Sequence, residues 1–93
     1  MTIDQLPERN NDIPGSEQGM YRKYHVQRVD GADQPGEKYE GAQYLVLDLT
    51  NDPFARLAAL AYADACSVMY PKLADDIKAQ LMQIIDGRST NHE

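Results

Sequence analysis

Few side chains in this sequence could do chemistry, and each lies where a catalytic role is difficult to build. His25 lies on the polar side of an alternating segment, and the sequence assigns it no carboxylate partner. Cys66 follows Asp64 in the middle of a helical pattern, whereas a catalytic thiol needs a helix N-terminus or a basic neighbour. We therefore expect an exposed or packing histidine and a small, buried cysteine.

Paired carboxylates and phosphate-binding loops are also poorly supported. Asp75 and Asp76 are adjacent, so on a helix their side chains diverge by about 100° and cannot work as an acid–base pair. The glycines between residues 31 and 41 are spread through a turn and do not lead into a helix. Cysteine and histidine do not occur at metal-binding spacings. The sequence therefore predicts no catalytic residue, no metal site and no cofactor, and a protein that is not an enzyme.

A specific contact is easiest to place in the long loop from Gly31 to Ala42. This loop combines charges of both signs with an aromatic ring, and tyrosine and arginine are enriched where proteins bind one another. The predicted partner-binding residues, in and beside the loop, are Arg28, Lys38, Tyr39, Glu40, Tyr44 and Val46. The alternative is an ordinary irregular hairpin loop.

The chain of 93 residues is near the lower limit for folding on a single hydrophobic core. Residues 1–20 contain proline, glycine and asparagine without an apolar period, which predicts a mobile N-terminal arm. Residues 21–87 form the predicted domain, and residues 88–93, which include His92, form a predicted disordered tail. Because so short a domain is marginal alone, self-association is a reasonable expectation.

The composition excludes some classes of partner. Fifteen acidic and nine basic residues give a net charge of −6 at pH 7, which argues against direct nucleic-acid binding. A basic partner fits this charge better, although net charge also simply keeps small proteins in solution. The single cysteine cannot form an internal disulfide, and no apolar run or leader pattern indicates a membrane or secretion. We expect a cytoplasmic protein.

Two segments have the composition of β-strands. Residues 21–29 alternate and are rich in β-formers, and residues 43–49 follow the long loop. In the second segment Leu45, Leu47 and Leu49 share one face, which is expected to cover the helices. Tyr44 and Val46 on the opposite face are also rather apolar and could lie under the arm, meet another strand or form an interface.

Two helices are expected after the strands. Asp52 followed by Pro53 is a good N-cap and first-turn pair, and Tyr70-Pro71 predicts a sharp turn before a second helix that ends near Gly87. The first helix is expected to pack through Phe54, Leu57, Ala58, Ala61, Ala65, Val68 and Met69. The second is expected to pack through Leu73, Ile77, Leu81 and Ile84, widened by Ala74, Met82 and Ile85. The predicted fold is therefore α+β, with two antiparallel strands followed by two packed helices (ββαα).

The sequence also resembles a family. In order along the chain, the segments that carry the resemblance are Lys23–Val26 with Arg28, Asp30-Gly31, Pro35–Lys38, Tyr44–Leu49, Asp52-Pro53, Ala61–Cys66 and Tyr70–Asp76. They look like a widespread set of short uncharacterised proteins of tailed bacteriophages and prophages, over about residues 22–78. In those proteins histidine and cysteine often occur near the positions of Tyr39 and Ala42, so a metal role for this loop is doubtful here. The resemblance implies a phage accessory protein that acts in a bacterial cytoplasm.

Together these observations predict a non-enzymatic binding protein. Its expected partner is a bacterial host protein that it modulates or blocks, for example as a counter-defence factor. One alternative is a small-molecule sponge formed at an oligomer interface, in which Arg28, Lys38 and tyrosines bind a nucleotide. Another is a structural homo-oligomer joined through Tyr44 and Val46.

Overall fold

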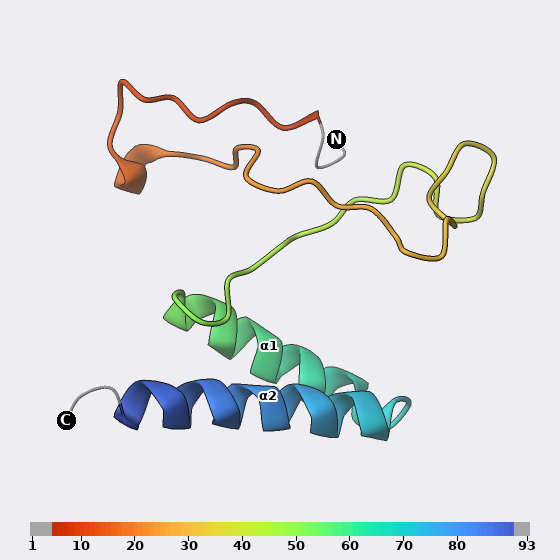
Figure 1. Cartoon of the computed structure of the whole chain (residues 1–93), viewed down its shortest axis with the longest axis vertical. Helices are drawn as coiled ribbons and strands as arrows, with labels where there is room; N and C mark the ends of the chain where they lie inside the picture. The colour runs from red at the N-terminus through yellow and green to blue at the C-terminus, as the bar shows by residue number, and fades with distance from the viewer. Residues whose placement is uncertain (1–4, 91–93) are drawn as a thin grey trace. The chain divides into compact units, whose positions relative to one another are not determined.

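The computed structural model describes residues 5–90, in two units that are treated separately here, Met1–Val46 and Leu47–Glu93. The described part of the first unit includes the short 3-10 helix η2 (Gly15–Glu17), and that of the second includes the α-helices α1 (Pro53–Cys66) and α2 (Pro71–Thr90) (Figure 1). The first four residues of the predicted arm, and residues 91–93 of the predicted tail with His92, lie outside the described residues.

The start of α1 confirms the prediction from Asp52 and Pro53. The Asp52 carboxylate accepts a hydrogen bond from the backbone N–H of Phe54 at 2.9 Å, and Pro53 occupies the first helical position. Both features suit the first turn, where backbone N–H groups have no partner within the helix. Just before this cap, the Asp48 carboxylate accepts from the backbone N–H groups of Thr50 and Asn51, which tightens the entry into the helix.

The connection between the helices also follows the prediction. The helix α1 ends at Cys66, and Ser67 caps it by donating from its hydroxyl to the carbonyl of Asp64 at 2.9 Å. The backbone N–H of Tyr70 still reaches the carbonyl of Cys66, and α2 begins at Pro71. Proline stops the first helix and starts the second because it disfavours a helical conformation at Tyr70 but fits the first turn of a new helix.

The contact between α1 and α2 uses a different face of α1 from the one predicted. The fully buried side chains of α1 are Ala55 and Ala63, at 1 % and 0 % exposed, with Ala59 and Cys66 half-buried on the same face. The expected face, Phe54, Leu57, Ala58, Ala61, Ala65, Val68 and Met69, is exposed. This correction has a steric reason: small side chains allow two helix backbones to approach closely, whereas the large ones would hold them apart.

The packing face of α2 was predicted in most of its positions. Ala74 and Leu81 are buried and Ile77 and Ile84 half-buried, but Leu73, Met82 and Ile85 are exposed. An ion pair between Lys78 and Asp64, with 3.1 Å between Nζ and Oδ1, joins the two helices beside this contact. The helices therefore form an antiparallel hairpin (Figure 1).

The predicted end of the second helix is wrong. The helix continues through Gly87 to Thr90, and Gly87 does not adopt the left-handed conformation expected of a C-cap. A glycine within a helix costs about 1 kcal/mol relative to alanine, which does not suffice to end a helix by itself.

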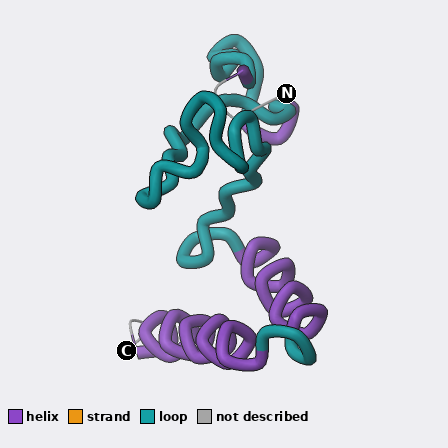
Figure 2. The backbone as a smooth tube through the Cα atoms, turned by 90° about the vertical axis from the view of Figure 1, so that its right-hand side faces the viewer, coloured by secondary structure: helices purple, strands orange, loops and turns teal. Residues whose placement is uncertain are grey.

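The predicted ββαα fold is also wrong, because the described residues contain helices and loops but no β-strand (Figure 2). Residues 21–28 and 43–48 have no regular secondary structure, Val29 and Leu49 lie in turns, and the two segments form no β-ladder with each other. The second segment is moreover divided between the units, because the boundary falls between Val46 and Leu47. The described part of the chain is therefore all-α in its regular structure.

The failure to pair has a local cause. An antiparallel pair needs a connection that returns the chain in register, and the loop between these segments folds on itself through a series of turns. The leucine face predicted for the second strand is kept only in its last part. Leu47 and Leu49 line a shallow depression with Ala58, Ala59, Tyr62, Ile77 and Gln80, whereas Leu45 is exposed.

None of the helices in residues 5–90 has the length and apolar character that crossing a membrane requires.

The alanine contact can be tested with a matched pair of substitutions. Ala63→Leu forces a larger side chain into the closest part of the hairpin and is expected to lower the free energy of unfolding by about 1–3 kcal/mol. Ala65→Leu places the same side chain on the exposed face of α1 and is expected to change it by less than about 0.5 kcal/mol. Urea unfolding followed by circular dichroism at 222 nm measures both. A larger loss of stability for Ala65→Leu than for Ala63→Leu would instead support the packing face predicted from the sequence.

Candidate functional site

The predicted binding loop is a compact series of turns within the first unit. Successive backbone hydrogen bonds run from Gly31 to Arg28, Gln34 to Gly31, Glu37 to Gln34 and Glu40 to Glu37, each from N–H to carbonyl oxygen. A longer-range bond from the N–H of Tyr39 to the carbonyl of Ala32, at 2.8 Å, closes the loop. Three glycines, Gly31, Gly36 and Gly41, have positive φ angles, which other residues rarely adopt.

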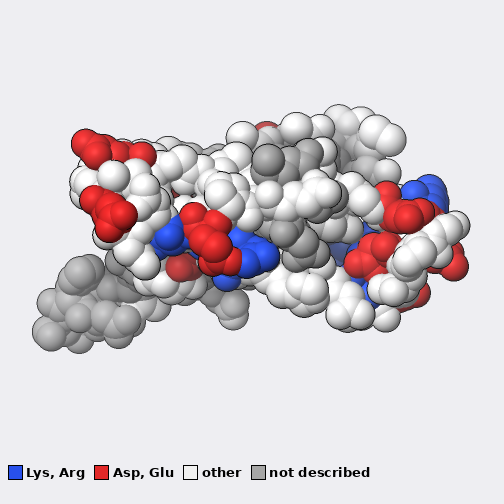
Figure 3. Space-filling view, turned by 90° about the horizontal axis from the view of Figure 1, so that it is seen from above, with Lys and Arg blue, Asp and Glu red and all other residues white. Residues whose placement is uncertain are grey.

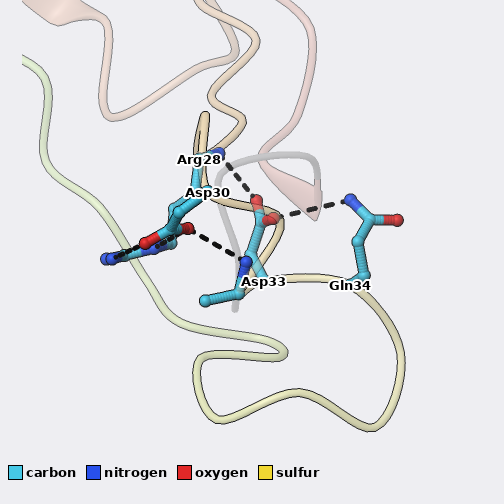
Figure 4. A network of polar contacts seen from close by, with 5 residues as sticks. Arg28, Asp30, Asp33 and Gln34 are labelled. Carbon is cyan, nitrogen blue, oxygen red and sulfur yellow. Dashed lines mark hydrogen bonds and ion pairs between the residues drawn. The ribbon is translucent and has the colours of Figure 1, made fainter.

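The base of the loop is organised by two carboxylates around Arg28 (Figure 4). The guanidinium donates to both oxygens of Asp30, from Nε at 2.9 Å and from Nη2 at 2.6 Å. The same Asp30 accepts from the backbone N–H of Ala32 at 3.0 Å, and Asp33 accepts from the backbone N–H of Arg28 at 3.0 Å. These bonds tie residues 28, 30, 32 and 33 together, so polar contacts rather than apolar packing fix the start of the loop.

The electrostatics of this cluster agree with its geometry. The hydrogen bonds from Arg28 and from the backbone of Ala32 lower the pKa of the Asp30 carboxyl well below its usual range. The pKa of Arg28 is raised in turn, chiefly by its hydrogen bond to Asp30 and further by the charge of that carboxylate. Bidentate arginine–carboxylate pairs are stronger and more directional than single ion pairs. The pair nevertheless lies at the surface, so it fixes orientation more than it stabilises the chain.

An aromatic ring lies over this polar base. The guanidinium carbon of Arg28 lies 4.2 Å from the centre of the Tyr39 ring, and the Nζ atom of Lys38 lies 5.1 Å from it. Both distances allow a cation–π interaction. Glu40 accepts a hydrogen bond from the backbone N–H of Gly36 at 3.0 Å, which holds the tip of the loop. Tyr39 thus lies within cation–π distance of two cations while remaining 36 % exposed.

The structure brings four of the six predicted site residues into this loop, namely Arg28, Lys38, Tyr39 and Glu40. Tyr44 is half-buried beyond it, and its hydroxyl oxygen is buried without a hydrogen-bond partner in the described part of the chain. Val46 is exposed at the last position of the first unit. The hydrogen bonds and ring contacts described above involve Arg28, Lys38, Tyr39 and Glu40, so the compact site consists of these four loop residues.

Sequence reasoning missed Asp30 and Asp33 as parts of the site. Asp30 followed by Gly31 is typical of a turn, and aspartate in a turn also accepts hydrogen bonds from backbone N–H groups two residues ahead. The hydrogen bond from the backbone N–H of Ala32 to Asp30 is of this kind, so it could have been predicted from the sequence. The bond from the backbone of Arg28 to Asp33 spans five residues and depends on how the loop folds, so local sequence could not reveal it.

The arrangement suits recognition better than chemistry. A phosphate that approached Arg28 would find the Nε and Nη2 edge of the guanidinium already donating to Asp30, and it would meet the negative charge of that carboxylate. Within residues 5–90 no three histidine, cysteine, aspartate or glutamate side chains are grouped so that they could hold a metal ion. Cys66 lies in the other unit, half-buried, with its sulfur 3.6 Å from the carbonyl oxygen of Ala63.

The charges on the molecular surface are mixed. On the face drawn in Figure 3, acidic and basic groups lie beside one another near the centre and at the right, whereas the acidic groups at the left have no basic group beside them. Such mixing reflects local pairs such as Arg28 with Asp30 and Lys72 with Asp76.

Comparison with known proteins gives no relative: no protein-family model, no curated protein and no solved structure matches this chain.

The Asp30 cluster predicts a pH dependence of the loop. Because the folded-state pKa of Asp30 is lowered, the stabilisation is present above the ordinary aspartate value of about 3.9 and is lost as the pH falls below it. Carbon NMR of the Asp30 carboxyl should show a midpoint below that value. The amide signal of Ala32 should shift along the same curve, since Ala32 donates to Asp30.

Asp30→Asn serves as the matched variant for this titration. It keeps the size of the side chain but removes the titrating group, so the acid shift of the Ala32 amide should disappear. A carboxyl midpoint at or above about 3.9 in the unmodified protein would contradict the arrangement.

Proposed function

We propose that this protein is a non-enzymatic binding protein and that its loop of residues 28–42 contacts a bacterial host protein, whose activity it modulates or blocks. The observation that carries this proposal is the exposed Tyr39 ring, which lies within cation–π distance of both Arg28 and Lys38 on a loop closed by successive backbone hydrogen bonds. Aromatic and arginine side chains contribute most strongly to protein interfaces. An ordered loop also loses less conformational entropy on binding than a mobile one.

The construction of the first unit supports a role in contact rather than in scaffolding. None of its described residues, 5–46, is fully buried, so local hydrogen bonds hold its shape. Segments that lack a core often bind by lying along a partner's surface, which supplies the apolar cover that they cannot supply themselves. The exposed Tyr39, Leu45 and Val46 provide apolar area for such a contact.

Charge and resemblance suggest the class of partner. The loop between residues 31 and 42 carries Asp33, Glu37 and Glu40 against the single cation Lys38, which suits a partner with a basic surface. The resemblance to short phage and prophage proteins supports a partner in the bacterial host. Blocking a host defence protein would be one form of this activity.

The proposal can be tested by affinity purification from a bacterial lysate, followed by calorimetry with the captured protein. Tyr39→Ala is expected to weaken binding at least about tenfold, because truncating an aromatic hot spot costs about 2 kcal/mol or more. Tyr24→Ala is the matched control: it lies in the same unit, outside the loop, and is 40 % exposed against 36 % for Tyr39. The control is expected to bind like the unmodified protein.

Two outcomes would count against the proposal. Capture of no host protein at stoichiometric level would remove the binding function. Equal weakening by both substitutions would place the contact outside the loop, with tyrosine loss acting through the fold of the unit.

A further inference from the structure

The helical hairpin of the second unit leaves a large apolar groove along one side. The groove has a volume of about 650 Å³ and is lined by Pro53, Arg56, Leu57, Leu60, Lys78, Leu81, Met82 and Ile85. It lies beside the alanine contact, on the side opposite the depression that Leu47 and Leu49 line. One side of the hairpin thus receives leucines from its own unit, whereas the groove side is covered by no described residue of that unit.

The hairpin has too small a core to leave this groove in water. The fully buried residues of the unit's described part are Ala55, Ala63, Ala74 and Leu81, three of them alanines that remove little apolar surface from water. Folding must order two helices of 14 and 20 residues, which costs conformational entropy. In an isolated hairpin, this small core alone would have to offset that cost. In addition, α1 carries only two charged side chains, Arg56 and Asp64, and a helix that is apolar nearly all round is normally covered.

We propose that a second copy of this chain covers the groove, so that two hairpins pack groove to groove as a four-helix bundle. This surface is distinct from the loop of the proposed function and from the Tyr44 and Val46 face that the sequence suggested for an oligomer. Four-helix bundles are the usual way in which two helical hairpins bury their apolar sides.

The area available fits a dimer of this kind. The large apolar side chains in and beside the groove, Phe54, Leu57, Leu60, Met82 and Ile85, are each between 42 % and 78 % exposed. They offer on the order of 500 Å² of apolar surface per copy. A stable interface buries about 800 Å² per partner in total, a little over half of it apolar, so the groove supplies the apolar share.

The charges around the groove are compatible with self-association. Lys78 and Arg56 line it, Asp64 pairs with Lys78, and Asp86 follows the lining residue Ile85 in the chain. A two-fold axis that crosses the groove at right angles to its length reverses its ends, which brings Lys78 of one copy towards the Ile85 end of the other. A surface with both signs can complement itself, whereas a rim of one sign would repel its copy.

The experiment is sedimentation equilibrium on the full chain, combined with mixed-label NMR. The expected result is a reversible dimer with intermolecular contacts between the methyl groups of Leu57 or Leu60 and those of Met82 or Ile85. A monomer throughout the accessible concentration range would overturn the proposal. So would a dimer whose intermolecular contacts arise elsewhere, or binding of another segment of the same chain in the groove.

Two substitutions give a matched comparison. Leu60→Glu places a carboxylate in the groove and is expected to raise the dimer dissociation constant by at least about a hundredfold, because removing a charge from water is costly even where Arg56 and Lys78 line the same groove. Ala61→Glu introduces the same carboxylate at the next residue of the helix, which is exposed and lies outside the groove. This substitution is expected to change the dimer dissociation constant by less than about threefold. If Leu60→Glu also unfolds the hairpin, the mixed-label contacts in the unmodified protein still decide the question. Equal dissociation constants for two folded variants would contradict the proposed interface.

Discussion

The close approach of α1 and α2 through alanines is the constraint on which the second unit depends. Ala55, Ala59 and Ala63 bring the backbone of α1 near Ala74 and Leu81 of α2. Small side chains give close van der Waals contact but bury little area, so the contact fixes the geometry of the hairpin without supplying much of its stability. The same choice turns the larger side chains of α1 outward, where they form the apolar surface of the hairpin.

The helices could be predicted in detail because their ends depend on local chemistry. Asp52, Pro53 and Pro71 act on backbone groups within one helical turn, so neighbouring residues decide the outcome. The packed face could not be predicted in the same way. The larger apolar residues of α1 form a regular stripe, and so do its alanines, and only the presence of α2 decides between the two stripes.

The prediction of strands was wrong for a related reason: a segment becomes a β-strand only by forming hydrogen bonds to a neighbouring segment. Residues 21–29 have a suitable composition, but nothing local shows whether 43–49 will return beside them. For the proposed site, the composition of the loop indicated Arg28, Lys38, Tyr39 and Glu40, and the structure places these four residues together in the loop. Asp33 could not be predicted as part of this cluster, because its hydrogen bond to the backbone of Arg28 forms only when the loop has folded.

The polar base of the loop also has a thermal consequence. The bonds between Arg28 and Asp30 are polar, whereas burial of apolar surface is what gives unfolding its large heat-capacity change. Opening of this loop should therefore contribute little to the curvature of the stability with temperature. Cooling weakens apolar contacts such as those between helices, yet it leaves charge-assisted hydrogen bonds largely intact. The two units would then respond differently to cold, with the loop keeping its shape at temperatures that loosen the hairpin.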